Sequence, residues 1–169
     1  MSNLKASIQE LNLLTDEILK TVEPLSKEMI RQKPSSEAWS VMEIVCHVEE
    51  AVPYWLAELK GVIQAPGTEW GRGLQDEGRL SAVASADDRS IEDVLEGIRR
   101  NKQEAHQVLG SLSESDLSIE APSRNPRFGT KPMSFVVDHL LVEHLDKHLG
   151  QIKRTIAQIS ALNNEEKEG

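Results

Sequence analysis

Residues 143–151 read EHLDKHLGQ and form the centre of the longest helical pattern in the chain, which we predict over residues 132–162. An α-helix advances by about 100° per residue, so His144 and His148 lie about 40° apart on one helix face. Val137 and Leu141 lie within about 60° of His144 on that same face. The two histidines therefore occupy the middle of the apolar stripe that the helix turns toward the core.

Three other segments carry apolar residues at three- and four-residue steps, which is the spacing of amphipathic helices. They run over residues 4–22, from residue 40 to a glycine at 61 or 67, and over residues 90–112. Ser40 and Glu43 form a capping-box pattern, and Ser90 is a further capping signal. Since no segment has a convincing strand pattern, we predict an all-α four-helix bundle with one domain over residues 1–162. The charged tail, residues 163–169, is expected to fray.

The predicted helices are joined by long connections. The first contains a short helix over residues 25–32, which ends before Pro34. Residues 64–89 are rich in Gly, Pro, Ser, Asp and Ala and have little periodicity, so we expect a loop there, either a lid or binding segment or plain surface. The polar connection formed by residues 113–131 is long enough to cross the bundle. The topology we expect is a four-helix bundle with long crossover connections.

The composition limits the partners and the compartment. The chain has 28 acidic and 19 basic residues, a net charge of −9, so neither a nucleic acid nor an anionic membrane is the expected partner. Cys46 is the single cysteine, which excludes an internal disulfide and fits a reducing compartment. The first residues lack the apolar core of a signal peptide, and no apolar run reaches membrane-spanning length. We therefore expect a cytoplasmic protein.

A third histidine, His47, borders the inward stripe of the second predicted helix. Together with His144 and His148 it would give a metal ion three protein ligands and leave one coordination position open. The alternative is that each inward histidine is a core residue hydrogen-bonded to a carbonyl group. The pair has the common His-x-x-x-His spacing but lacks the His-Glu-x-x-His form of zinc proteases. The residues alone leave both possibilities open.

The remaining histidines are not candidates for the site. His139 falls about 220° from His144, on the face that we expect to be solvent-exposed. His106 lies on the third predicted helix, without a histidine or cysteine at ligand spacing.

Two blocks of sequence resemble the DinB/YfiT-like superfamily. Residues 39–47 read WSVMEIVCH, similar to its block in which Trp-Ser precedes a helix start and a histidine, and residues 143–152 read EHLDKHLGQI, similar to its closing His-x-x-x-His-x-Gly-Gln block. The resemblance implies a four-helix bundle with a divalent ion bound by His47, His144 and His148, and a homodimer formed through bundle faces. Characterised relatives include S-transferases that use bacillithiol or mycothiol, and a maleylpyruvate isomerase.

Several functions are compatible with such a centre. Three neutral imidazoles leave a divalent ion its full charge, so a thiol or water at its open position would lose a proton more easily. Our first hypothesis is a metal-dependent S-transferase of the bacillithiol type, acting on a low-molecular-weight thiol and an electrophilic small molecule. The alternatives are a metal-dependent hydrolase, a non-catalytic, dimerising metal-binding stress-response module, and a metal-free bundle. The ion is zinc, nickel, iron(II) or copper, among which three imidazoles do not discriminate.

Other residues near the predicted site have weaker signals. Glu43, Glu50 and Tyr54 lie near His47 in helical register and could orient an imidazole or carry a proton, although a solvated helix face explains the glutamates as well. Cys46 points about 100° away from His47, which favours a core cysteine. Trp70, in the predicted loop, is a candidate pocket or lid residue.

Overall fold

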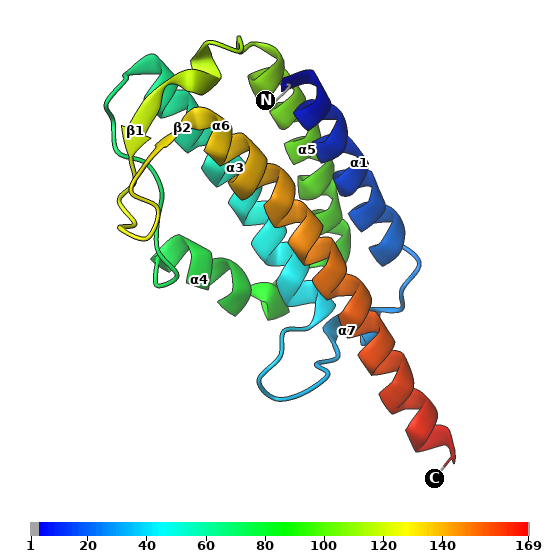
Figure 1. The fold of residues 1–169 in the computed structure, drawn as a ribbon. Helices are drawn as coiled ribbons and strands as arrows, with labels where there is room; N and C mark the ends of the chain where they lie inside the picture. The colour runs from blue at the N-terminus through cyan, green and yellow to red at the C-terminus, as the bar shows by residue number, and fades with distance from the viewer. Residues whose placement is uncertain (1–3, 169) are drawn as a thin grey trace.

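The computed structural model describes residues 4–168 and has four long helical rods (Figure 1). The first three rods are α1 (Leu4–Val22), α3 (Val41–Gln64) and α5 (Ile91–Gly110). The fourth is continuous and consists of α6 (Met133–Phe135), a π-helical segment η3 (Val136–Val142) and α7 (Glu143–Glu168). The predicted four-helix bundle is thereby confirmed.

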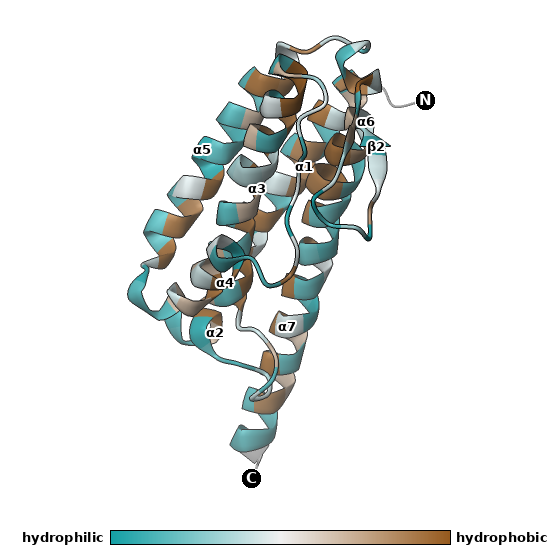
Figure 2. Cartoon of the chain, turned by 90° about the vertical axis from the view of Figure 1, so that its left-hand side faces the viewer, coloured by the Kyte–Doolittle hydropathy of each residue, from teal (hydrophilic) through white to brown (hydrophobic). Residues whose placement is uncertain are grey.

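Helix α3 lies at the centre of the packing. It contacts α5, α7 and the short helices α2 (Lys27–Arg31) and α4 (Glu77–Ala84), while α1 packs against α5 and α7. The long helices carry apolar and hydrophilic faces, coloured brown and teal in Figure 2. The predicted capping box begins α3: the Ser40 hydroxyl accepts the Glu43 N–H at 3.1 Å, and the Ser40 N–H donates to Glu43 Oε1 at 2.9 Å. This cap fixes where α3 begins and hence which of its residues face inward.

The chain between residues 64 and 89 is more ordered than we predicted. It contains α4, whose first turn is capped by Asp76, and a 3-10 turn η1 (Ala86–Asp88). Helix α4 has no buried residue and a weak apolar stripe, which explains why periodicity did not reveal it.

The connection between α5 and the fourth rod also contains structure that we did not predict. A 3-10 turn η2 (Asp116–Ser118) precedes a small antiparallel sheet of β1 (Glu120–Pro122) and β2 (Thr130–Pro132). Each strand has only three residues, which is too short for an alternating pattern to be seen in the sequence.

Trp70 joins these two connections, and its predicted role as a lid residue is wrong. Its side chain is fully buried, and its ring packs near Trp55, Phe128 and Phe135. The indole N–H donates to the Ala121 carbonyl at 2.8 Å. Trp70 therefore anchors the 64–89 segment to the β-sheet region.

The C-terminal tail also differs from the prediction. Helix α7 continues to Glu168 and projects beyond the other helices in Figure 1. The tail is exposed, as we expected, but Glu165, Glu166 and Lys167 are good helix formers and extend the helix by propensity. Among the described helices, none is both long and apolar enough to cross a membrane.

We predict that Trp70→Ala lowers the free energy of unfolding by about 3–5 kcal/mol, because it leaves a cavity and removes a buried hydrogen bond. Urea denaturation measures the change. The control is Leu74→Ala in the same segment, whose side chain is 64% exposed and whose loss should cost less than about 0.5 kcal/mol. Equal losses in the two variants would contradict the anchoring role.

Candidate metal centre

Packing of α3 against α7 brings the three predicted histidines together. His47 Nε2 lies 3.2 Å from His144 Nε2, and His148 Nε2 lies 2.9 Å from the same atom. His47 and His148 are buried, while His144 is partly exposed. The three residues form a group whose ligand atoms all lie within 4.8 Å of one another. Among residues 4–168 no other group of His, Cys, Asp and Glu meets this criterion.

The nitrogen separations fit a tetrahedral ion. With metal–nitrogen bonds of about 2.0–2.1 Å, two ligands of such an ion lie about 3.3 Å apart. The observed 3.2 Å is close to this value, and the 2.9 Å separation needs only a small outward shift of one imidazole. The cluster could therefore hold one divalent ion on its three Nε2 atoms.

Hydrogen bonding around the rings also favours an ion. Gln151 Oε1 lies 2.7 Å from His148 Nδ1 and accepts a hydrogen bond from its N–H, so His148 Nε2 carries a lone pair. Without an ion, the His144 Nε2–H can donate to one neighbouring ring, and the Nε2 of the other ring is left without a good partner. An ion would instead bind the lone pairs of all three Nε2 atoms. His47 Nδ1 is buried with no hydrogen-bond partner, and an ion at Nε2 would not change this.

Burial keeps the imidazoles in the neutral form that binds metals. Desolvation, with smaller repulsions from nearby cations, lowers the pKa of His47 to about 3 and that of His144 to about 2. Desolvation also lowers the pKa of His148. Protons therefore compete weakly for these nitrogens near neutral pH.

A cavity of about 420 Å³ opens beside the three histidines. Its walls combine apolar side chains with cations, and its residues come from α3, α7 and both long connections. The lining includes Trp55, Leu74, Phe128 and Leu140, the cationic residues Arg72, Arg79, Arg127 and Lys147, and the acidic residue Glu143. A small organic molecule could reach the three histidines through this space.

His139 is exposed, as predicted, but it also lines this cavity, which its predicted position opposite His144 did not indicate. It is about half-exposed, its Nδ1 lies 2.7 Å from Glu143 Oε2, and its ring stacks on Phe135. The reason is the π-helical segment η3, whose wider turns rotate His139 less far around the axis than α-helical spacing does. We had assumed α-helical geometry throughout.

Two of the residues near His47 have structural roles in place of the predicted site roles. Glu43 closes the capping box, and Glu50 forms an ion pair with Arg72 through both carboxylate oxygens. Tyr54 donates to Glu58 Oε1 at 2.8 Å and lies under the Arg72 guanidinium, 3.8 Å from its ring centroid. Glu50 and Tyr54 thus position Arg72 at the cavity, and neither forms a hydrogen bond with the three histidines.

Cys46 is a core cysteine, as predicted. Its side chain is buried, and desolvation raises the pKa of its thiol to about 11. The thiol therefore stays protonated and is a poor nucleophile near neutral pH.

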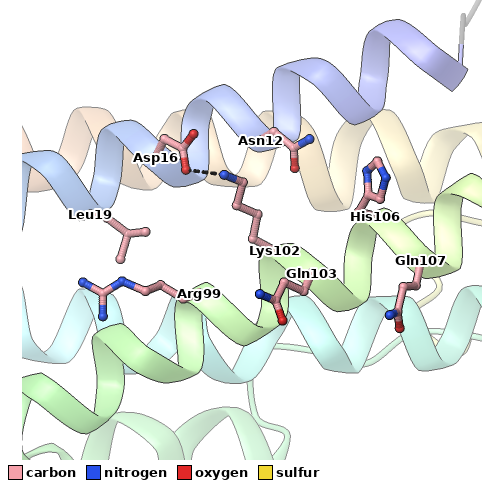
Figure 3. Close-up of a pocket in the computed structure, with 8 residues that line it drawn as sticks. All are labelled: Asn12, Asp16, Leu19, Arg99, Lys102, Gln103, His106 and Gln107. Carbon is pink, nitrogen blue, oxygen red and sulfur yellow. Dashed lines mark hydrogen bonds and ion pairs between the residues drawn. The ribbon is translucent and has the colours of Figure 1, made fainter.

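His106 also lies outside the candidate site, as predicted. It lines a larger, polar cavity of about 600 Å³ between α1 and α5, where Lys102 pairs with Asp16 at 2.7 Å (Figure 3). No second histidine or cysteine lines this cavity. The volume of a cavity therefore does not identify the functional site, since the metal-ligating side chains line the smaller cavity beside the three histidines.

Gln151 belongs to the closing block of the sequence but had no predicted role, and Arg79 and Arg127 were not predicted to lie at the site. Gln151 lies three residues after His148, a spacing that places the two side chains next to each other on a helix and could have suggested their hydrogen bond. Arg79 and Arg127 lie in the two connections, and no periodic signal relates them to the histidines.

We predict that the metal-free protein loses stability as the pH falls below about 6.5. The pKa values of the cluster are lowered on folding, so the unfolded chain binds more protons below its imidazole pKa of 6.5. Stability should therefore be complete above that pH and fall toward about pH 3, by at most about 1.4 kcal/mol per pH unit per histidine. Urea denaturation between pH 6.5 and 5, in the presence of a chelator, measures the slope.

The His148→Gln variant should have a shallower slope, since one buried imidazole is gone. The matched control is His106→Gln, which removes an exposed imidazole outside the cluster. A metal-free wild-type protein whose stability does not change between pH 6.5 and 5 would contradict the neutral, buried state of the cluster.

Comparisons with known proteins agree with the four-helix fold. YfiT from Bacillus subtilis, described as a probable metal-dependent hydrolase with an unusual four-helix bundle topology, has a TM-score of 0.81 at 14% identity, over 95% of this chain and 90% of YfiT. A mycothiol-dependent maleylpyruvate isomerase has a TM-score of 0.69 at 15% identity, over 94% of this chain and 68% of the isomerase. No curated protein matches the chain in sequence. The family model of the DinB superfamily matches residues 10–152, a range that includes all three clustered histidines, and the chain therefore belongs to the DinB superfamily.

Proposed function

We propose that this protein is a metal-dependent enzyme that transfers a low-molecular-weight thiol to an electrophile, with His47, His144 and His148 as the metal ligands. The observation that carries the proposal is the convergence of three neutral imidazoles at the wall of an open cavity. Three protein ligands would leave one coordination position, and that position would face a space large enough for a small organic molecule.

A divalent ion at these nitrogens would lower the pKa of a thiol that reaches the open position, favouring its nucleophilic form. In the transfer itself the thiol loses its proton, its sulfur forms a bond to an electrophilic carbon, and the leaving group departs with the bonding electrons. The protein must bind both molecules, orient the imidazoles and accept the thiol proton.

The proton acceptor that we propose is Glu143. Among the described residues that line the cavity, it is the single carboxylate, and it directly precedes His144 in the chain. Its hydrogen-bond partner His139 lines the same cavity and could pass a proton on to solvent. Gln151 has a positioning role, since its hydrogen bond to His148 Nδ1 directs Nε2 toward the other two imidazoles.

Two relatives support different reactions at such a centre. The mycothiol-dependent isomerase favours a thiol as the molecule that binds at the ion, in line with the thiol transfer proposed here. The description of YfiT as a probable metal-dependent hydrolase favours water, and hydrolysis is our second candidate. The apolar walls formed by Trp55, Phe128 and Leu140 suit an organic thiol, which is why we place thiol transfer first.

The remaining proposal is a non-catalytic metal-binding module that forms a homodimer. Light scattering coupled to size-exclusion chromatography would establish whether a homodimer forms. Cytoplasmic location and the nature of the ion, with zinc, nickel and iron(II) as the candidates, stay predictions.

We predict that His148→Ala abolishes stoichiometric metal binding and that Gln151→Ala weakens it by about 10- to 100-fold, because the imidazole loses its orienting hydrogen bond. Competition with a chromophoric chelator, on protein purified without a histidine tag, measures both affinities. His106→Ala is the control and should bind metal as the wild type does. Unchanged metal affinity in His148→Ala would contradict the proposed three-histidine metal centre.

We predict that the metal-loaded protein accelerates the reaction of bacillithiol or a related thiol with an electrophile, and that Glu143→Gln lowers kcat by about 100-fold or more while its metal content is unchanged. A thiol panel with chromogenic electrophiles measures the rate, and chelation should abolish it. Ester hydrolysis without a thiol would favour the hydrolase. A metal-loaded protein that turns over no substrate in either assay would favour the non-catalytic module.

A further inference from the structure

Three cations at the cavity have no acidic partner. Arg79 is half-buried, Arg127 and Lys147 are exposed, and all three line the space beside the histidines. Within residues 4–168, none of them forms an ion pair with a carboxylate. The chain has 28 acidic residues against 19 basic ones, so the gathering of these cations at one cavity runs against its net charge of −9.

Other arginines of the same region are paired. Arg72 forms ion pairs with Glu50 and Asp76, and its side chain is 6% exposed. Arg89 binds both carboxylate oxygens of Glu49, at 2.8 and 2.9 Å. Their charges are compensated inside the protein. Arg79 instead donates to the Leu74 carbonyl at 3.2 Å, which holds the side chain but leaves its charge uncompensated.

Arg79 lies between two spaces that meet at the histidines. A second cavity, of about 490 Å³, shares Arg79, Lys147 and His148 with the first and is also lined by Arg154. Each space also has one acidic lining residue, Glu143 in the first and Glu37 in the second. Cationic residues outnumber acidic ones in both linings, which favours a positive potential beside His148.

The charge of the centre adds to this potential. The three imidazoles are neutral ligands and would leave a divalent ion with its whole charge. In a cavity with three cationic side chains that no carboxylate pairs and with one acidic side chain, a neutral substrate would leave this charge uncompensated. A guanidinium matches the planar geometry of a carboxylate and can bind it through two hydrogen bonds.

We propose that the molecule bound in this cavity is a small organic anion carrying a carboxylate, held by Arg79 and Arg127. The apolar side chains Trp55, Phe128 and Leu140 would contact its carbon skeleton, while Lys147 adds long-range attraction. The proposal rests on the proposed function, because it treats this cavity as the substrate-binding space. It adds that the substrate carries a negative charge.

The test is calorimetric titration of zinc-loaded protein with succinate, with its neutral diamide succinamide, and with inorganic phosphate. Succinate should bind at least about 10-fold more tightly than succinamide, since it gains charge-assisted hydrogen bonds. It should also bind more tightly than phosphate, which cannot use the apolar walls. Equal binding of succinate and succinamide would overturn the proposal, and tighter binding of phosphate would overturn the choice of a carboxylate.

Because a carboxylate can bind zinc directly, the arginines need their own test. The double variant Arg79→Gln and Arg127→Gln should keep its zinc and lose about 10-fold or more of its succinate affinity. The control is Arg100→Gln, an exposed arginine on α5 away from the cavity, and it should bind succinate as the wild type does. Undiminished succinate binding by the double variant would overturn the proposal.

These titrations do not depend on turnover. Preference for succinate without thiol transfer would support the anion site and contradict the proposed S-transferase reaction. Thiol transfer without preference for succinate would support the reaction and contradict the anion site.

Discussion

The packing of α3 against α7 places three imidazoles where water solvates a charge poorly, and the rest of the site depends on this burial. Desolvation lowers the pKa of each histidine, so the cluster consists of neutral lone-pair donors. Neutral polar groups in a core need partners, and His47 Nδ1 has none. A protein that needed these side chains for packing alone would be more stable with apolar ones, which is why the burial itself argues for a function.

The geometry of the cluster is set by local features outside it. The capping box at Ser40 determines the phase of α3 and therefore the direction of His47. The π-helical segment before Glu143 brings His139 and Glu143 to the cavity side of the fourth rod. Such segments are uncommon and often occur at functional sites, where the changed helix phase redirects side chains. Here it supplies a candidate acid–base pair beside the candidate metal ligands.

The cations around the site differ in whether a carboxylate pairs with them. Arg72 is buried, stacked on Tyr54 and bound to Glu50, and it serves as part of the wall. Arg79 and Arg127 come from the two connections that Trp70 fastens together. The anchor formed by Trp70 thus has a consequence for recognition, because it holds the segments that carry the cationic side of the cavity.

The sequence by itself determined the four long helices and the placing of His144 and His148 on one helix face, because helix periodicity, capping residues and four-residue spacing are local properties that survive without tertiary contacts. The assignment of His47 as a third ligand came from the resemblance to the DinB/YfiT-like superfamily. The sequence failed for α4, for the three-residue strands and for the extent of α7. These elements are too short, too weakly amphipathic or too polar to leave a periodic signal. It also failed for His139, since an i→i+5 segment is invisible to a rule that assumes α-helical turns. Only the tertiary structure decided that Trp70 is a buried anchor, that Gln151 orients His148, and that Arg79 and Arg127 line the same cavity as the histidines. Those relations join residues on separate elements, or depend on which rotamer a packed neighbour allows, and no local pattern contains that information.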